Sequence, residues 1–249
     1  MIRTDSRDGI TVIRLNRPEG HNALVPALLE SLVEHLQQAA KRGRPVVLTA
    51  TGTAFCPGAD LKWLGTAHDP ALAVADLVAV HHLAISTLLD MPVPVIAAIN
   101  GSVAGGGLGL ALAADYRIAG ERATFTAAYF RLGLTPDGGS SAFLARTIGA
   151  ARTLELLLTN RRLSAAEALA WGMISEVVAD AQLVERAVAF ASGLAAVPAF
   201  ALRQSRQLLD TINMRDQLQL EAVAIRTAAR GEAFRTALKA FLDAHPDHG

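Results

Sequence analysis

The stretch VPVIAAINGSVAGGGLGLALAADY, residues 93–116, determines the fold that we predict. Its first half is an apolar run typical of a buried strand that stops at Asn100 and Gly101, and its second half has the small apolar residues of a buried helix. Between them, Gly105, Gly106 and Gly107 leave backbone N–H groups uncovered by side chains. Because N–H groups at the start of a helix bind oxyanions, we expect a functional site at this turn.

A second stretch, TATGTAFCPGADLKWL at residues 49–64, repeats this layout. Strand-type residues at 46–48 precede a turn at Cys56, Pro57 and Gly58, so two turns can supply one backbone donor each. Further strands are predicted at residues 10–15, 116–119 and 124–126, and helices at 25–36 and 72–89. This alternation of strands and helices predicts the α/β class.

The composition disfavours several partners and locations. The 23 Lys and Arg residues balance the 23 Asp and Glu residues, so no net charge recruits nucleic acid or an anionic membrane. A single cysteine, Cys56, permits no intramolecular disulfide, and no apolar leader follows Met1, so we expect a cytoplasmic protein. Residues 91–114 are uncharged and have an alternative interpretation as a membrane span, which Pro92, Pro94 and the glycines disfavour.

The pattern after residue 180 is helical throughout, with Pro198 opening one helix and Gly231 separating the last two. We therefore expect an α/β core at residues 1–180 and a helical region at 181–249 that packs on the core or on another subunit. Ser140 and Ser141 are predicted to cap the helix that follows the turn at residues 135–139.

The order of the motifs resembles that of the enoyl-CoA hydratase/isomerase (crotonase) superfamily. FCPGADLK at residues 55–62 precedes INGSVAGGGLGLALAAD at 99–115, and similarity extends over residues 10–24 and 130–178. The resemblance implies a spiral of ββα units with a C-terminal helical region that mediates trimerisation. It also implies an acyl-CoA thioester as substrate, no separate cofactor because the substrate carries coenzyme A, and a homotrimer or hexamer.

The resemblance also implies which residues act. The backbone N–H groups of Ala59 and Gly106 match the donors that hold the thioester carbonyl in the family's oxyanion hole. Two such donors stabilise an enolate oxygen by several kcal/mol, on the order of 3 kcal/mol each. The segment of Ala59, Asp60, Leu61 and Lys62 matches the part that contacts coenzyme A.

The two glutamates of the hydratases are replaced here by Gly109 and Tyr129. Hydration needs a base for water and an acid for C2, which these residues do not supply, so hydratase activity is not expected. Asp137 in PDGG matches an acidic position of isomerase members, and we predict that it moves a proton from C2 to C4. The alternative for Asp137 is an ordinary Pro-Asp-Gly turn.

Two other functions stay open at this point. The chain is also similar to 4-chlorobenzoyl-CoA dehalogenase, in which Asp137 would be the nucleophile, His82 the catalytic histidine and Tyr129 the replacement for a tryptophan. The alternative for His82 is structural, since His81 and His82 are adjacent on a helix, where one of the two would be solvated and the other partly packed. A non-catalytic acyl-CoA-binding or scaffold protein is the third possibility. No metal-ligand spacing is present in the sequence.

Overall fold

The computed structural model describes residues 1–246, and its strands form two sheets. The larger sheet has six strands, parallel except for the antiparallel pair at one edge, in the order β1 (Ile2–Arg7), β2 (Ile10–Leu15), β3 (Val46–Ala50), β5 (Val95–Ile99), β7 (Tyr116–Gly120) and β10 (Glu176–Val178). The smaller sheet has the order β4 (Ala54–Cys56), β6 (Ser102–Ala104), β8 (Thr124–Thr126) and β9 (Leu163–Ser164), in which β9 is antiparallel.

The chain crosses between the two sheets in a repeating way. A strand of the larger sheet is followed by a strand of the smaller one in the pairs β3–β4, β5–β6 and β7–β8, and each pair is followed by helix. This repetition is the spiral of ββα units that the sequence resemblance predicted, and the fold class is confirmed. The predicted strands and the two long helices also occur, whereas β1 was not predicted because its side chains are mostly polar.

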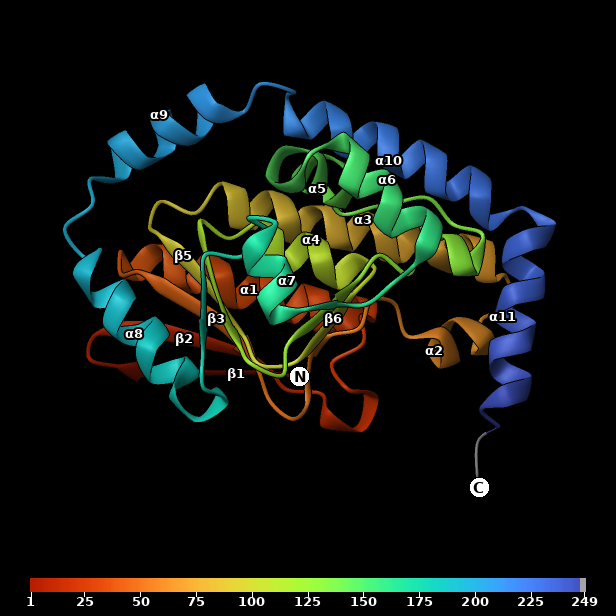
Figure 1. Cartoon of the computed structure of the whole chain (residues 1–249), viewed down its shortest axis with the longest axis horizontal. Helices are drawn as coiled ribbons and strands as arrows, with labels where there is room; N and C mark the ends of the chain where they lie inside the picture. Colours follow the sequence, from red (N-terminus) through yellow and green to blue (C-terminus); the bar gives the residue numbers. More distant parts are fainter. Residues whose placement is uncertain (247–249) are drawn as a thin grey trace.

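The helices surround the sheets, as Figure 1 shows. Short 3-10 turns occur at Pro18–Gly20, Phe130–Leu132 and Asp180–Gln182. The α-helices of the described part of the chain are α1 (Pro26–Arg42), α2 (Leu61–Thr66), α3 (Pro70–Leu89), α4 (Gly106–Leu112), α5 (Ser140–Ile148), α6 (Ala150–Thr159), α7 (Ala165–Ala170), α8 (Leu183–Gly193), α9 (Ala199–Leu209), α10 (Met214–Ala229) and α11 (Glu232–Ala244).

The stretch at residues 93–116 folds as a strand, a turn and a helix, with one addition to the prediction. After Asn100 and Gly101, residues of β6 pair with β4 and β8 before Gly105 turns the chain into α4 with a φ of +50°. A Cβ atom on Gly107 would lie 2.1 Å from the carbonyl oxygen of Cys56, so α4 packs against β4 only because this residue is glycine. The stretch is not a continuous helix, contrary to the alternative interpretation as a membrane span.

The helix with the composition of a membrane span is instead α3, whose mean hydropathy is 1.8 over an 18-residue window. It is the one such helix among the described residues, and core helices of water-soluble proteins pass the same test. Here α3 packs between α1 and α10 and buries Val74, Leu77, His81 and Ile85 on one side. These spacings of three and four residues place His81 on the buried face of the helix.

The helices after residue 180 pack in two different places. Helix α8 covers the face of the large sheet that carries Val12, Val47 and Ile96, burying Leu183 and Ala187 there. Helices α10 and α11 pack instead on α3 and α2, on the other side of the molecule (Figure 1). The division of the chain at residue 180 stays a prediction.

Helix α9 stands apart from the core in Figure 1, and none of its residues is buried. It is fastened by the guanidinium group of Arg206, which donates to the Asp115 carboxylate (Nε–Oδ1, 2.8 Å) and to the carbonyl oxygens of Leu89, Met91 and Val93. Since these carbonyls lie at the end of α3 and in the segment between α3 and β5, the contact connects α9 to the strand that leads into the glycine turn.

Candidate active site

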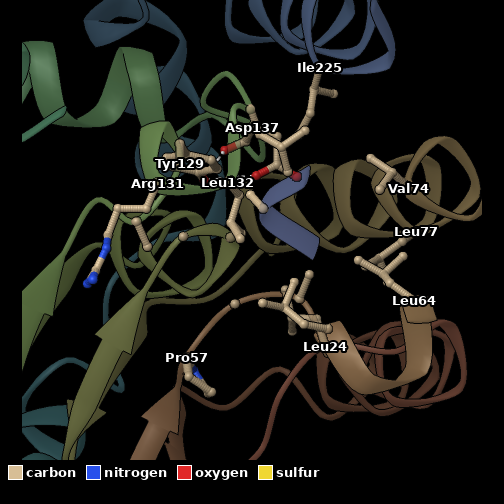
Figure 2. Close-up of a pocket in the computed structure, with 18 of the residues that line it drawn as sticks. Leu24, Pro57, Leu64, Val74, Leu77, Tyr129, Arg131, Leu132, Asp137 and Ile225 are labelled. Carbon is tan, nitrogen blue, oxygen red and sulfur yellow. Dashed lines mark hydrogen bonds between the residues drawn. The ribbon is translucent and has the colours of Figure 1, made fainter. Parts of the chain in front are cut away.

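A cavity of about 540 Å³ lies between the two glycine turns, helix α3 and the C-terminal helices α10 and α11. Figure 2 shows Asp137 and Tyr129 on one side of it and Leu24 and Pro57 on the other. Most of its lining is apolar, as expected for a site that takes an acyl chain. Among the described residues that line it, Asp137 is the only carboxylate, and the other polar side chains are those of His81, Tyr129, Arg131 and His245.

The two glycine turns contact each other at the edge of this cavity. A Cβ atom on Gly58 would lie 3.4 Å from the backbone nitrogen of Gly106, so the residues before Ala59 touch the start of α4. The first turn is held by Leu24, whose N–H donates to Gly58 (2.7 Å) and whose carbonyl accepts from Asp60 (3.0 Å).

Ala59 and Gly106 both line the cavity. Within residues 1–246, neither backbone N–H donates to a protein acceptor, in contrast to the N–H groups of Asp60 and Leu108 beside them. Two free donors from adjacent turns are the arrangement that binds a carbonyl oxygen whose negative charge grows during a reaction.

Asp137 is 7% exposed and sits in the turn before α5, and both of its carboxylate oxygens have donors. Oδ1 accepts from the Tyr129 hydroxyl at 2.8 Å (Figure 2). Oδ2 lies 3.3 Å from Nδ1 of His81. Burial alone would raise the pKa of Asp137, but the hydrogen bond and charge of His81, then Tyr129 and His82, together lower it below its usual value of 3.8. Asp137 is therefore ionised at neutral pH and able to accept a proton.

Tyr129 stabilises this carboxylate and keeps its own proton. Burial, followed by the negative charge of Asp137, raises the pKa of Tyr129 well above 10. Its hydroxyl also lies 2.9 Å from the hydroxyl of Ser140, which donates to the Asp137 carbonyl at 2.6 Å. Tyr129 thus lies in the cavity, as its position in the sequence suggested, but as a fixed hydrogen-bond donor.

The sequence resemblance matched Gly109 to one of the hydratase glutamates, and the structure has no room at residue 109 for a side chain. A Cβ atom on Gly109 would lie 2.3 Å from the carbonyl oxygen of Gly138, a distance that real Cβ atoms essentially never show. The turn that carries Asp137 therefore occupies the space into which a side chain at residue 109 would extend.

His82, a candidate from the sequence, does not line the cavity. Its Nε2 accepts the N–H of Gly138 at 3.0 Å, and burial lowers its pKa to about 4, so it holds the turn as a neutral ring. The histidine beside Asp137 is His81, which is 1% exposed and whose Nε2 has no hydrogen-bond partner among the described residues. The spacing of His81 from Val74, Leu77 and Val78 could have revealed this in the sequence.

The rest of the predicted coenzyme A segment is divided between the cavity and the surface. Leu61 lines the cavity with Ala59. Asp60 instead forms an ion pair with Arg17 (2.6 Å) and accepts the N–H of Trp63 at the start of α2, so it fastens the turn. Lys62 is exposed in the first turn of α2. The contact of this segment with coenzyme A stays a prediction.

The start of helix α5 departs from the sequence prediction. Ser140 and Ser141 were expected to cap α5, but the N-cap residue is Gly139 and no side chain of the turn itself caps the helix. The hydroxyl of Ser141 bonds instead to Glu221 of α10, 80 residues away along the chain. In contrast, helix α7 begins with a capping box formed by Ser164 and Glu167.

Comparison with known proteins places these features in a family. A sequence model of the enoyl-CoA hydratase/isomerase family matches residues 5–246. A probable enoyl-CoA hydratase of Rhodobacter capsulatus is 35% identical over 254 residues, covering 99% of this chain and 96% of that protein. The 1,2-epoxyphenylacetyl-CoA isomerase of Escherichia coli is 36% identical over 244 residues, covering 94% and 92%.

A third relative, the 4-chlorobenzoyl coenzyme A dehalogenase-2 of an Arthrobacter species, is 37% identical over 201 residues, covering 79% of this chain and 73% of that protein. Among solved structures, an enoyl-CoA hydratase from Bacillus halodurans superposes with a TM-score of 0.87 at 26% identity, covering 96% of this chain and 99% of that one. The chain belongs to the enoyl-CoA hydratase/isomerase family and has the crotonase fold.

Proposed function

We propose that this chain is an acyl-CoA isomerase in which Asp137 carries the proton between two carbon atoms of the acyl group. The observation that supports this best is that Asp137 is the single carboxylate among the described residues lining the cavity. Isomerisation needs only one group that takes up a proton and returns it, whereas hydration needs both a base for water and an acid.

The reaction follows from the positions of the groups. The thioester carbonyl accepts the N–H groups of Ala59 and Gly106, which makes the protons on C2 more acidic. The Asp137 carboxylate takes a proton from C2, and the electron pair moves into a dienolate whose negative oxygen stays between the two donors. The carboxyl group, whose proton can exchange with water, then returns a proton at C4, so that the double bond shifts to C2–C3 and no water is consumed.

The geometry at Gly109 supports isomerisation over hydration. A glutamate at this position would collide with the Gly138 carbonyl, and Tyr129 at the other hydratase position holds its proton too tightly to act as a base. The Tyr129 hydroxyl and His81 instead keep Asp137 ionised and in one orientation, which lowers the cost of bringing it to the C2 proton.

A second candidate is nucleophilic substitution on an aromatic acyl-CoA, as the dehalogenase relative suggests. The observation in its favour is the histidine 3.3 Å from Asp137, although this is His81 and not His82. Asp137 would displace the leaving group from the ring, and water would then cleave the aryl ester. Because both carboxylate oxygens already accept hydrogen bonds, which weaken a nucleophile, we rank this candidate below the isomerase.

We also propose that coenzyme A enters only as part of the substrate and that the protein is a cytoplasmic homotrimer or hexamer. Exposed apolar side chains on α9 and the segment after it support a partner subunit, since large unburied apolar patches mark interfaces. They are Phe200, Leu208, Leu209 and Ile212. A sedimentation measurement showing a monomer at micromolar concentration would contradict the assembly.

The function is tested with a panel of enoyl-, dienoyl- and aromatic-CoA thioesters, followed by Asp137→Asn on the active substrate. Asparagine keeps the size and turn propensity of aspartate but cannot take a proton, so turnover should fall by a factor on the order of a hundred or more while thioester binding persists. Crotonyl-CoA hydration should be very slow. In heavy water, deuterium should enter C2 or C4 of the product.

Other outcomes would point elsewhere. A covalent aryl ester on Asp137, detected by mass spectrometry, would indicate substitution. Thioester binding without turnover of any compound in the panel would indicate a non-catalytic binder. Unchanged turnover in Asp137→Asn would show that Asp137 only shapes the turn, and the proposal would fail.

A further inference from the structure

Helix α10 carries a carboxylate, Glu221, that is 4% exposed and that the proposed reaction does not use. It lies between Leu218 and Ile225, three and four residues away, on the face of α10 that packs against the core. A charged residue on such a face is costly unless donors surround it. The groups that donate hydrogen bonds to Glu221 therefore indicate its role.

The donors around Glu221 all belong to the start of α5. Oε2 accepts the N–H of Gly139 at 2.7 Å, and Oε1 accepts the N–H of Ser141 at 3.1 Å and the hydroxyl of Ser141. The first N–H groups of a helix have no partner within the helix, and no side chain of the turn itself caps α5. Glu221 supplies this cap from the C-terminal region, 80 residues or more away along the chain.

The same turn carries Asp137, two residues before Gly139. Gly138 and Gly139 both have left-handed backbone conformations, with φ of +61° and +75°, so the turn depends on external contacts to keep its shape. The N–H of Gly138 is held by His82 of α3, and that of Gly139 by Glu221 of α10. Two helices thus hold the two peptide groups that follow Asp137.

We propose that Glu221 is a positioning residue for Asp137, fixing the Gly138–Gly139 turn so that the carboxylate meets the C2 proton of the bound acyl group. The inference rests on the proposed function. It assigns to α10 a direct part in the reaction geometry, since a displacement of a reacting group by about 1 Å can cost a hundredfold in rate.

The test is Glu221→Gln, with Gln217→Ala as the matched control. The glutamine is isosteric but has one acceptor oxygen, so its amide N–H₂ group must face the N–H of either Gly139 or Ser141. Gln217 lies one turn earlier on α10 and donates only to the Ser141 hydroxyl, at 2.9 Å. We expect kcat to fall roughly ten- to a hundredfold in Glu221→Gln with KM changed less than about threefold, and to stay within about twofold in Gln217→Ala.

Hydrogen exchange supplies a readout that does not depend on activity. The Gly139 or Ser141 amide should exchange at least about tenfold faster in Glu221→Gln than in the parent protein. If Glu221→Gln does not fold, Glu221→Asp replaces it, because a side chain shorter by one methylene keeps the charge but cannot reach both amides.

The outcomes separate this inference from the proposed function. Parental kcat in Glu221→Gln, while Asp137→Asn is inactive, would overturn the positioning role and leave the isomerase proposal standing. Equal losses of kcat in Glu221→Gln and Gln217→Ala would also overturn it, because they would show a general loss of packing. Parental turnover in Asp137→Asn would instead contradict the proposed function itself.

Discussion

Replacing Gly109 with alanine tests whether the turn that carries Asp137 fills the space into which a side chain at residue 109 would extend. Two effects oppose each other. Within a helix such as α4, alanine is more favourable than glycine by about 1 kcal/mol. Against this, the new Cβ atom would lie 2.3 Å from the Gly138 carbonyl oxygen, where ordinary van der Waals contact begins near 3.4 Å.

The steric effect should dominate, because the obstacle is backbone and not the end of a flexible side chain. The carbonyl carbon of Gly138 would also lie 3.1 Å from the new Cβ atom, so the whole peptide group must move. Overpacking of this kind costs about 1–3 kcal/mol, which can exceed the gain in helix propensity. For a protein of this size each kcal/mol changes Tm by about 2–4 °C, so we expect a net loss of a few degrees.

We expect kcat to fall as well as Tm, because the peptide group that must move, Gly138–Gly139, begins one residue after Asp137. The assay is a thermal melt combined with kcat on the active thioester. Gly193→Ala in α8 is the control, since a Cβ atom there meets nothing within 4 Å and should not lower Tm. If Gly109→Ala raises Tm and leaves kcat unchanged, the turn does not occupy this space and the reasoning is wrong.

Two further predictions concern the glycine turn and pH. Gly106→Pro should lower kcat/KM on the order of a hundredfold, because proline is tolerated at the first position of a helix but has no N–H. Gly106→Ala keeps the N–H donor and should retain most turnover, although its Cβ atom would lie 3.0 Å from His81 and from Leu24. Equal losses of kcat/KM in the two variants would refute the donor role of Gly106. Because burial lowers the pKa of His82 to about 4, the unfolded chain binds a proton between about pH 6.5 and 4 that the folded chain does not, so the free energy of unfolding should fall as pH is lowered through this window. His82→Gln keeps an acceptor for the Gly138 N–H, and its free energy of unfolding, measured by urea titrations at several pH values, should depend less on pH. An unchanged pH dependence would contradict the lowered pKa of His82.

Local patterns in the sequence predicted most of the fold. The apolar runs at residues 46–48 and 93–99 are buried on both faces of the sheet, and such continuous apolar runs indicate parallel strands. The spiral itself depends on β6, a three-residue strand that no local signal separates from a turn, and it was predicted only through the resemblance to a family. The edge strand β1 has a polar pattern, so its place in the sheet comes from pairing with β2.

The site was harder to predict because its contacts join distant segments. The proposed roles of Ala59 and Gly106 rest on the order of two motifs, and both residues line the cavity. Whether His81 or His82 faces Asp137 depends on the rotation of α3 about its axis. The spacing of Val74 and Leu77 indicates this rotation, but the two histidines are adjacent in the sequence and are easily confused. Glu221 had a comparable signal, a charge within the buried face of a helix, yet nothing in the sequence says that its partner is a turn 80 residues away.

Glycine at position 109 and the presence of Asp137 in the cavity belong to one packing arrangement. With glycine at position 109, the Gly138 peptide lies against α4, and this approach brings the preceding residue, Asp137, within reach of Tyr129 and His81. A side chain at position 109 would push that peptide away and remove the donors that keep Asp137 ionised. A single substitution to glutamate therefore cannot add a hydratase carboxylate to the existing site, since the turn at residues 137–139 would have to be rebuilt at the same time.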